Sequence, residues 1–85
     1  MKLISTNIAW EDYEYWISRD NRMVKRIQQL LKEIGENPYD GSGCPLPLKF
    51  DHPGLWSRKI FREHRLIYKV EGENIYILSC RFHND

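Results

Sequence analysis

The spacing of apolar residues changes once along this 85-residue chain, across a glycine- and proline-rich segment at 39–47. Before that segment, apolar residues recur every three or four positions, which predicts amphipathic helices. After it, apolar and polar residues alternate, which is typical of half-buried strands. Because the two patterns occupy separate halves of a short chain, the sequence predicts an α+β fold in a single domain, residues 1–85.

A helical hairpin is predicted in the first half. Asn7 can cap its first helix, and Asp20 or Asn21 can cap the second. Gly35 and Pro38 end the second helix. The residues expected to pack in the core and between the helices are, in the first helix, Trp10, Tyr13, Tyr15 and Trp16, and in the second, Met23, Val24, Ile27, Leu30, Leu31 and Ile34.

Five short strands are expected, one before the helices and four after the loop. Their ranges are 2–5, 48–50, 56–61, 64–70 and 75–82. The predicted order is therefore β-α-α-β-β-β-β, with the N-terminal helix hairpin packed on a twisted, mainly antiparallel sheet.

One face of this sheet must meet the helices, which leaves the other face open. The sets assigned to the helices are the more apolar ones: Leu66, Tyr68 and Val70, with Tyr76, Leu78, Cys80 and Phe82. Arg65 and His83 are therefore expected on the open face. Strand 56–61 adds either Arg58 or Lys59 to that face, and its alternation alone does not decide which.

The formal net charge of +1 hides an uneven distribution. Residues 1–40 carry six basic and seven acidic groups, whereas residues 41–85 carry seven basic and five acidic groups. Arginine can hold a phosphate through two hydrogen bonds, and histidine can move a proton near neutral pH. Cleavage of RNA by attack of the 2′-OH needs a base, a cation and an acid, so these residue types could serve it without a metal.

Several other classes of protein are disfavoured by composition. No apolar run approaches the roughly 18 residues of a membrane span. The two cysteines, Cys44 and Cys80, form no metal-type CxxC pair, and we expect them to be reduced thiols in a cytoplasmic protein. The sequence contains no metal-ligand spacing and predicts no cofactor.

Three segments of the second half are informative together: WSRKI at 56–60, EHRLIY at 63–68 and SCRFH at 79–83. With MKLI at 1–4 and PLPLK at 45–49, they resemble the YoeB toxins, a branch of the RelE/ParE superfamily of bacterial toxin–antitoxin systems. The resemblance implies a RelE-like fold and a ribosome-dependent mRNA endonuclease that cuts the codon in the A site and stops translation. It also implies neutralisation by a YefM-like antitoxin, contact with operator DNA only through the toxin–antitoxin complex, and compatibility with a homodimer.

The resemblance also implies roles for individual residues. Arg65 should stabilise the cleaved phosphate, and His83 should act as the general acid. Glu63 should orient neighbouring basic residues. The remaining positions expected to contact RNA are Lys49, Lys59, Arg58, Phe82 and Asn84.

Two positions depart from the family's pattern. Leu46 occupies the place of the glutamate that serves as general base, and Asn84 occupies the place of a tyrosine. Leucine cannot accept a proton, and loss of a general base typically costs about 10²–10⁴-fold in rate. Two hypotheses follow, an attenuated endoribonuclease and a catalytically degenerate module that keeps antitoxin and ribosome binding. A ParE-like poison of DNA gyrase on the same fold is a weaker alternative, disfavoured by His83 and the EHRL segment.

Overall fold

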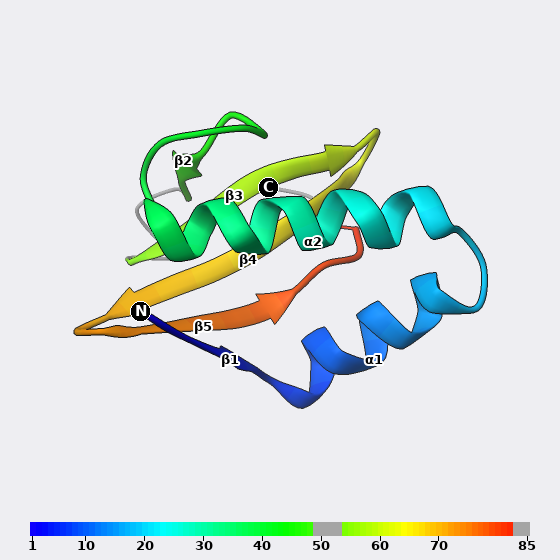
Figure 1. Ribbon diagram of the computed structural model, residues 1–85, viewed down its shortest axis with the longest axis horizontal. Coiled ribbons are helices and arrows are strands. Elements are labelled where there is room, and N and C mark those ends of the chain that lie inside the picture. The colour runs from blue at the N-terminus through cyan, green and yellow to red at the C-terminus, as the bar shows by residue number, and fades with distance from the viewer. Residues whose placement is uncertain (49–53, 83–85) are drawn as a thin grey trace.

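The fold places two helices on one side of a five-stranded sheet (Figure 1). The computed structural model describes residues 1–48 and 54–82. Its elements are β1 (Lys2–Ser5), α1 (Asn7–Ile17), α2 (Asn21–Glu36), β2 (Leu46–Pro47), β3 (Leu55–Phe61), β4 (His64–Glu71) and β5 (Asn74–Ser79). The predicted order of elements is confirmed.

The strands lie in the order β1-β5-β4-β3-β2. β1 pairs with β5 in parallel, and the other neighbouring strands are antiparallel, so the predicted mainly antiparallel α+β sheet is confirmed. The connection from β1 to β2, the two edge strands, runs through both helices and covers one face of the sheet (Figure 1). The opposite face is therefore free to carry a site.

The strand expected at 48–50 begins earlier than predicted. β2 consists of Leu46 and Pro47, which pair with Ser57 and Trp56 on β3. These two residues fall inside the segment expected to be a loop, because pairing with the edge of β3 overrides the turn preference of its prolines. Lys49 and Phe50, the rest of the expected strand, lie outside the described residues.

The helix caps agree with the sequence at one helix and differ at the other. Of the two predicted candidates, Asp20 and Asn21, it is Asp20 that caps α2, by accepting the Arg22 N–H over 3.0 Å. At α1 the expected cap Asn7 is wrong, because Asn7 is already the first helical residue. Thr6 is the cap instead: its Oγ1 accepts the Ala9 N–H and donates to the Leu78 carbonyl, both over 3.1 Å.

The core lies between α2, α1 and the covered face of the sheet. The predicted stripe of α2 is confirmed: Leu31 is partly buried against the core, and the other five residues, Met23, Val24, Ile27, Leu30 and Ile34, are buried. On α1 the prediction is only partly right. Ala9 and Trp16 are buried, whereas Trp10 remains 53% exposed, because Ala9 occupies the core-facing position one residue, or about 100°, away.

The last strand departs most from the prediction. Ile75 and Ile77 face the helices in place of Tyr76 and Leu78, and β5 ends at Ser79. Both alternating sets of this strand are apolar, so its own pattern could not identify the buried set. Contacts from α1 to the following residue, Cys80, account for the early end.

Two side chains of α1 form hydrogen bonds with the backbone of Cys80, which is therefore not paired as part of β5. The Asp12 carboxylate accepts the Cys80 N–H over 3.0 Å, and the Trp16 indole N–H donates to the Cys80 carbonyl over 2.9 Å. Cys80 is a core thiol, as predicted, and only 2% exposed. Burial, with the Asp12 charge nearby, raises the pKa of this thiol to about 12.

Neither helix of the described chain is long and apolar enough to cross a membrane.

Candidate active site

The pairing of β3 with β4 decides which basic residue of β3 lies on the open face. Lys59 is directly opposite Arg65, and Ser57 is directly opposite Ile67. Residues opposite each other in antiparallel strands project to the same face. Lys59, with Ser57, therefore shares the open face with Arg65, and the alternative that placed Arg58 there is excluded.

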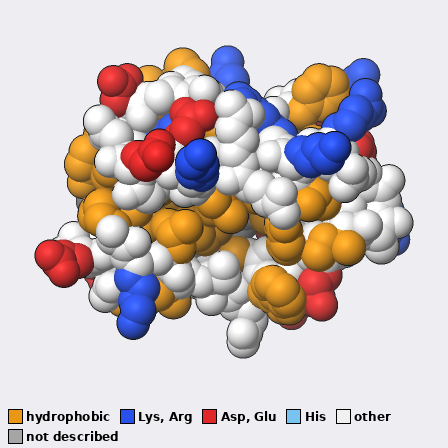
Figure 2. Space-filling model, in the orientation of Figure 1, with side chains coloured by type: hydrophobic (Ala, Val, Ile, Leu, Met, Phe, Trp, Pro, Cys, Tyr) orange, Lys and Arg blue, Asp and Glu red, His pale blue; other side chains and the backbone are white. Residues whose placement is uncertain are grey.

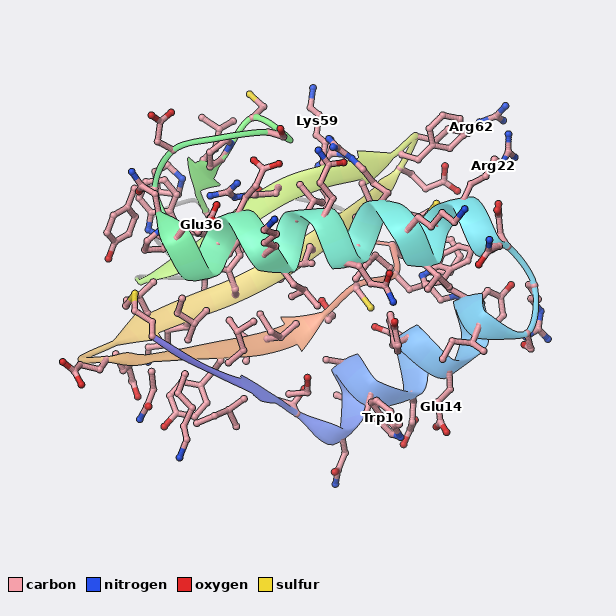
Figure 3. The ribbon with its side chains drawn as sticks, viewed as in Figure 1. Trp10, Glu14, Arg22, Glu36, Lys59 and Arg62 are labelled. Atoms are coloured by element: carbon pink, nitrogen blue, oxygen red, sulfur yellow. The ribbon has the colours of Figure 1, made fainter. Side chains whose placement is uncertain are left out.

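Three of the residues predicted for the site meet in one hollow of about 220 Å³. Leu46 reaches it from β2, Lys59 from β3 and Arg65 from β4. The described residues that line it are Cys44, Leu46, Pro47, Leu48, Ser57, Lys59 and Arg65. Leu46 is 53% exposed, so its apolar side chain faces the hollow and solvent rather than the core. In Figure 3, Lys59 extends away from α2.

A tight turn positions Arg65. The guanidinium Nη1 of Arg65 donates to the carbonyl of Arg62 over 3.2 Å. Arg62 itself has a φ of 53°, in the left-handed region that closes the short connection between β3 and β4. This bond orients one end of the guanidinium, and within the described part of the chain its other donors have no hydrogen-bond partner, which suits them to an anion.

Four lining residues of the hollow were not predicted as site residues, namely Cys44, Pro47, Leu48 and Ser57. Ser57 could have been recognised, because it alternates with Lys59 on the same strand. Cys44 has no comparable signal in the sequence. Its neighbour Gly43 accepts the Lys59 N–H over 2.6 Å, and this contact between distant segments brings the thiol to the hollow.

Arg58 has a structural role, which corrects its assignment to RNA binding. Its side chain is fully buried on the helix-facing side of β3, where it cannot contact RNA. The guanidinium donates to the carbonyls of Asn37, Asp40 and Ser42 and to the hydroxyl of Tyr68, over 2.7–3.2 Å. Arg58 therefore fastens the loop after α2 to the sheet.

Glu33 completes the surroundings of Arg58. Its carboxylate lies 3.6 Å from Arg58 Nη1 and accepts the Ser42 N–H over 2.7 Å. The hydrogen bonds from Ser42 and the charge of Arg58 lower the pKa of this carboxyl. The Glu33–Arg58 ion pair therefore helps to hold the loop after α2 and is not among the lining of the hollow.

Glu63 and Phe82 are not among the residues that line the hollow, and both contact His64. The Glu63 carboxylate is 3.7 Å from His64 Nε2, and the Phe82 N–H donates to His64 Nδ1 over 2.9 Å. His64 packs toward the helices against Trp16. The remaining predicted site residues, Lys49, His83 and Asn84, lie outside the described residues.

Comparison with known proteins identifies the family. A family model described as "YoeB-like toxin of bacterial type II toxin-antitoxin system" matches residues 5–84. Toxin YoeB of Escherichia coli strain K12 is 46% identical over 83 residues, which covers 98% of this chain and 99% of the relative. Toxin YoeB of a Synechocystis species is 45% identical and covers 98% and 96% of the two chains. The chain belongs to the YoeB toxin family.

Solved structures of the YoeB family have the same fold. A YoeB/ParE toxin from Agrobacterium tumefaciens has a TM-score of 0.94 at 44% identity and covers 99% of this chain and 100% of its own. A YoeB dimer from Staphylococcus aureus has a TM-score of 0.91 at 41% identity, with 99% and 98% covered. A heterotetrameric YoeB–YefM toxin–antitoxin complex from the same species has a TM-score of 0.88 at 41% identity and the same coverage. This YoeB-family chain is therefore a toxin of a type II toxin–antitoxin system.

The hollow of this YoeB-family toxin is lined by two cationic side chains, Lys59 and Arg65, and by the apolar side chain of Leu46. Lys and Arg side chains gather along the edge formed by the end of β3 and the start of α2 (Figure 2), where Figure 3 labels Lys59, Arg62 and Arg22. Two adjacent cations can bind a phosphate and stabilise added negative charge on it. Leu46, in the same hollow, can take no part in proton transfer.

Proposed function

We propose that this toxin is a metal-independent, ribosome-dependent endoribonuclease that cleaves mRNA in the ribosomal A site and so inhibits translation. The observation that supports it best is the direct pairing of Lys59 with Arg65 on the open face, with Leu46 completing the hollow. In the YoeB family, Leu46 stands where the resemblance puts a general base, so the hollow coincides with the expected catalytic position. Because leucine cannot act as that base, we propose that this toxin cleaves RNA more slowly than relatives that have a glutamate there.

The proposed reaction is an attack of the 2′-OH on the adjacent phosphorus. The new bond joins O2′ to phosphorus, the bond from phosphorus to O5′ breaks, and a 2′,3′-cyclic phosphate remains. Arg65 stabilises the charge of the phosphorane, while Lys59 and Lys49 hold the RNA backbone. His83 donates a proton to the leaving O5′. The proton of the 2′-OH passes to solvent, because Leu46 cannot accept it.

A second candidate function is a catalytically degenerate toxin that binds antitoxin and ribosome without cleaving RNA. The exposed Leu46 favours it, because a proton acceptor is absent from the one position of the hollow where the family has one. The retained Lys59–Arg65 pair favours the enzyme, because a purely protein-binding role does not need two adjacent cations in a hollow. We therefore place the attenuated enzyme first.

The proposed partners follow from the family. We infer that a YefM-like antitoxin neutralises this toxin, since a YoeB of Staphylococcus aureus forms a complex with YefM. A homodimer is also proposed, since a YoeB of that species forms one. Operator DNA would be contacted only through the toxin–antitoxin complex. The toxin would act in the cytoplasm, where its ribosome and mRNA partners are.

Primer extension on mRNA in a translating extract tests the proposal. The expected result is a new 5′ end within the A-site codon that increases with toxin concentration and is absent with Arg65→Ala. If full-length transcript persists at saturating toxin, the catalytic proposal is wrong. Retained co-purification with ribosomes in that case would favour the binding module. A parallel supercoiling assay with DNA gyrase is expected to show no inhibition.

A further inference from the structure

Phe61 is an aromatic residue at the end of β3 that the fold leaves 51% exposed. Its side chain lines two hollows, of about 250 and 280 Å³, between the start of α2 and the turn that joins β3 to β4. The two hollows share Met23 as well as Phe61, and buried Ile60 adds to the apolar wall of the first. An exposed aromatic ring beside an apolar hollow suits a flat or apolar partner.

Three arginines surround this ring. Arg22 and Arg26 line the first hollow from α2, and Arg62 lines the second. The guanidinium carbon of Arg62 lies 5.3 Å from the centroid of the Phe61 ring, in cation–π contact. Arg22 and Arg62 lie at the same edge in Figure 3, and Figure 2 shows an apolar patch there with basic side chains around it. We call Phe61, Arg22, Arg26 and Arg62 the Phe61 platform.

The platform is positively charged despite two nearby carboxylates. Asp20 caps α2 and lies 3.6 Å from Nε of Arg22, and Glu63 lies 3.7 Å from Nε2 of His64. The three arginines outnumber these two acids. The side chain of Arg22 is 88% exposed, so its guanidinium can turn toward an anion above the ring. Charge and shape together therefore fit a ligand that combines a flat ring with negative charge.

The platform also continues from the hollow that holds Lys59 and Arg65. Lys59 and Phe61 are two residues apart on β3, which places their backbones within about 7 Å of each other. The register of β3 against β4 shifts between these two residues, and a shift of this kind can re-aim a side chain. Nucleotides of a stacked strand rise about 3.4 Å each, so one or two nucleotides span the distance.

We propose that the Phe61 platform is a subsite for mRNA, in which a base beside the cleaved codon stacks on Phe61 and the arginines hold its phosphates. Aromatic rings that stack bases, with cations along the backbone, are the usual means of binding single strands without regard to sequence. The inference rests on the proposed function, because it takes the mRNA to be held at Lys59 and Arg65. An acidic peptide with an apolar side chain is the alternative occupant, and the continuity with Lys59 and Arg65 favours RNA.

Binding of RNA to the free toxin tests the stacking without any cleavage. The probe is a short RNA with methylated 2′-hydroxyls, which cannot be cut by 2′-OH attack. Its binding should shift the ring-proton resonances of Phe61 upfield, because a stacked base shields them. Phe61→Leu keeps an apolar side chain but should weaken binding about tenfold, whereas Phe61→Tyr should stay within about twofold. Trp10→Leu is the matched control, since Trp10 is 53% exposed on α1, on the other side of the molecule in Figure 3.

The salt dependence of the same binding tests the arginines. Arg62→Gln removes one phosphate contact and should reduce the slope of log K against log salt by about 0.7. Lys32→Gln, on an exposed part of α2 outside both hollows, should leave the slope unchanged. The proposal is overturned by equal losses of affinity in Phe61→Leu and Trp10→Leu, or by equal slopes in Arg62→Gln and Lys32→Gln. It is also overturned if RNA leaves the Phe61 resonances in place while an acidic leucine-containing peptide shifts them.

Programmed ribosomes decide whether the bound RNA is the mRNA. An abasic nucleotide is placed at one position beside the A-site codon at a time. In the wild type, one such position should raise KM about tenfold with kcat within about twofold, and in Phe61→Leu it should add nothing further. If no position has this effect, or if the two penalties multiply, the mRNA subsite is refuted. If the wild type cuts no A-site codon, the proposed function fails, and the binding of free RNA still decides whether Phe61 stacks a base.

Discussion

Arg58 and Lys59 are consecutive residues of β3 whose side chains leave opposite faces of the sheet. Arg58 is fully buried and bonded to three carbonyls of the loop after α2, whereas Lys59 is exposed beside Arg65. Arg58 therefore stabilises the fold, whereas Lys59 lies at the proposed site.

The same substitution at these two positions should therefore give opposite results. Arg58→Met leaves Glu33 and several loop carbonyls without their partner, and it should lower the free energy of unfolding by about 3–5 kcal/mol. Lys59→Met should change it by no more than about 0.5 kcal/mol, yet weaken cleavage. Urea unfolding followed by tryptophan fluorescence measures both. Equal stability of the two variants would contradict the buried role of Arg58.

Removal of Arg65 should abolish activity without unfolding the protein. Among the described residues the side chain makes one hydrogen bond, to the Arg62 carbonyl in an exposed turn, so Arg65→Ala should cost no more than about 1 kcal/mol in stability. Its cleavage rate should fall by about 10²–10³-fold, because the phosphorane loses its main cation. Arg65→Lys keeps the charge without the forked donors and should be intermediate. Full toxicity of a stably folded Arg65→Ala variant would refute the assignment.

Introduction of a carboxylate at position 46 should raise activity. Leu46 is exposed in the hollow with Lys59 and Arg65, and these cations would lower the pKa of a new carboxyl and keep it ionised at neutral pH. Leu46→Glu should therefore accelerate A-site cleavage by about 10²-fold or more. Leu46→Gln has the same shape without a basic oxygen and is the matched control. An equal gain in both variants would mean that proton transfer is not the cause.

The sequence predicted local features better than those that depend on distant contacts. The stripe on α2 and the cap at Asp20 were correct because both depend on residues within one or two turns of helix. The cap at Thr6 was missed, since its hydroxyl also bonds Leu78, a residue 72 positions away. Long-range contacts of this kind leave no trace in local spacing.

The candidate site shows the same division. Alternation along β3 indicates that Arg58 and Lys59 face opposite ways, but only the pairing with β4 decides which one meets Arg65. The place of Leu46 in the site came from the family resemblance, and no pattern predicted that β2 would begin at that residue. On β5, both alternating sets are apolar, so the buried set was decided by packing against α1.

The cap of α1 can be tested by a pair of conservative changes. Thr6→Ala removes the acceptor for the Ala9 N–H and the donor to the Leu78 carbonyl, and it should lower the free energy of unfolding by about 1–2 kcal/mol. Thr6→Ser retains the hydroxyl and should lose far less. Thermal unfolding followed by circular dichroism compares them, and equal losses in the two variants would mean that the hydroxyl contributes nothing.

The buried Cys80 thiol should make stability depend on alkaline pH. Its pKa is raised from 9.0 to about 12 in the folded state, so the folded protein retains the thiol proton where the unfolded chain has lost it. The stabilisation is fully present below pH 9.0 and is lost as pH rises toward 12. At pH 10 this loss amounts to about 1.4 kcal/mol, because one pH unit above the unfolded pKa corresponds to about 1.4 kcal/mol.

Comparison with Cys80→Ala isolates this effect from the titration of other groups. The stability advantage of the wild type over Cys80→Ala, measured by urea unfolding, should shrink by about 1.4 kcal/mol between pH 8 and pH 10. Thiol reagents provide an independent check, because Cys44 is exposed and Cys80 is buried. One thiol should react in the native protein and two in urea. A constant advantage across this pH range, or two fast-reacting thiols in the native state, would show that Cys80 is not held in the core.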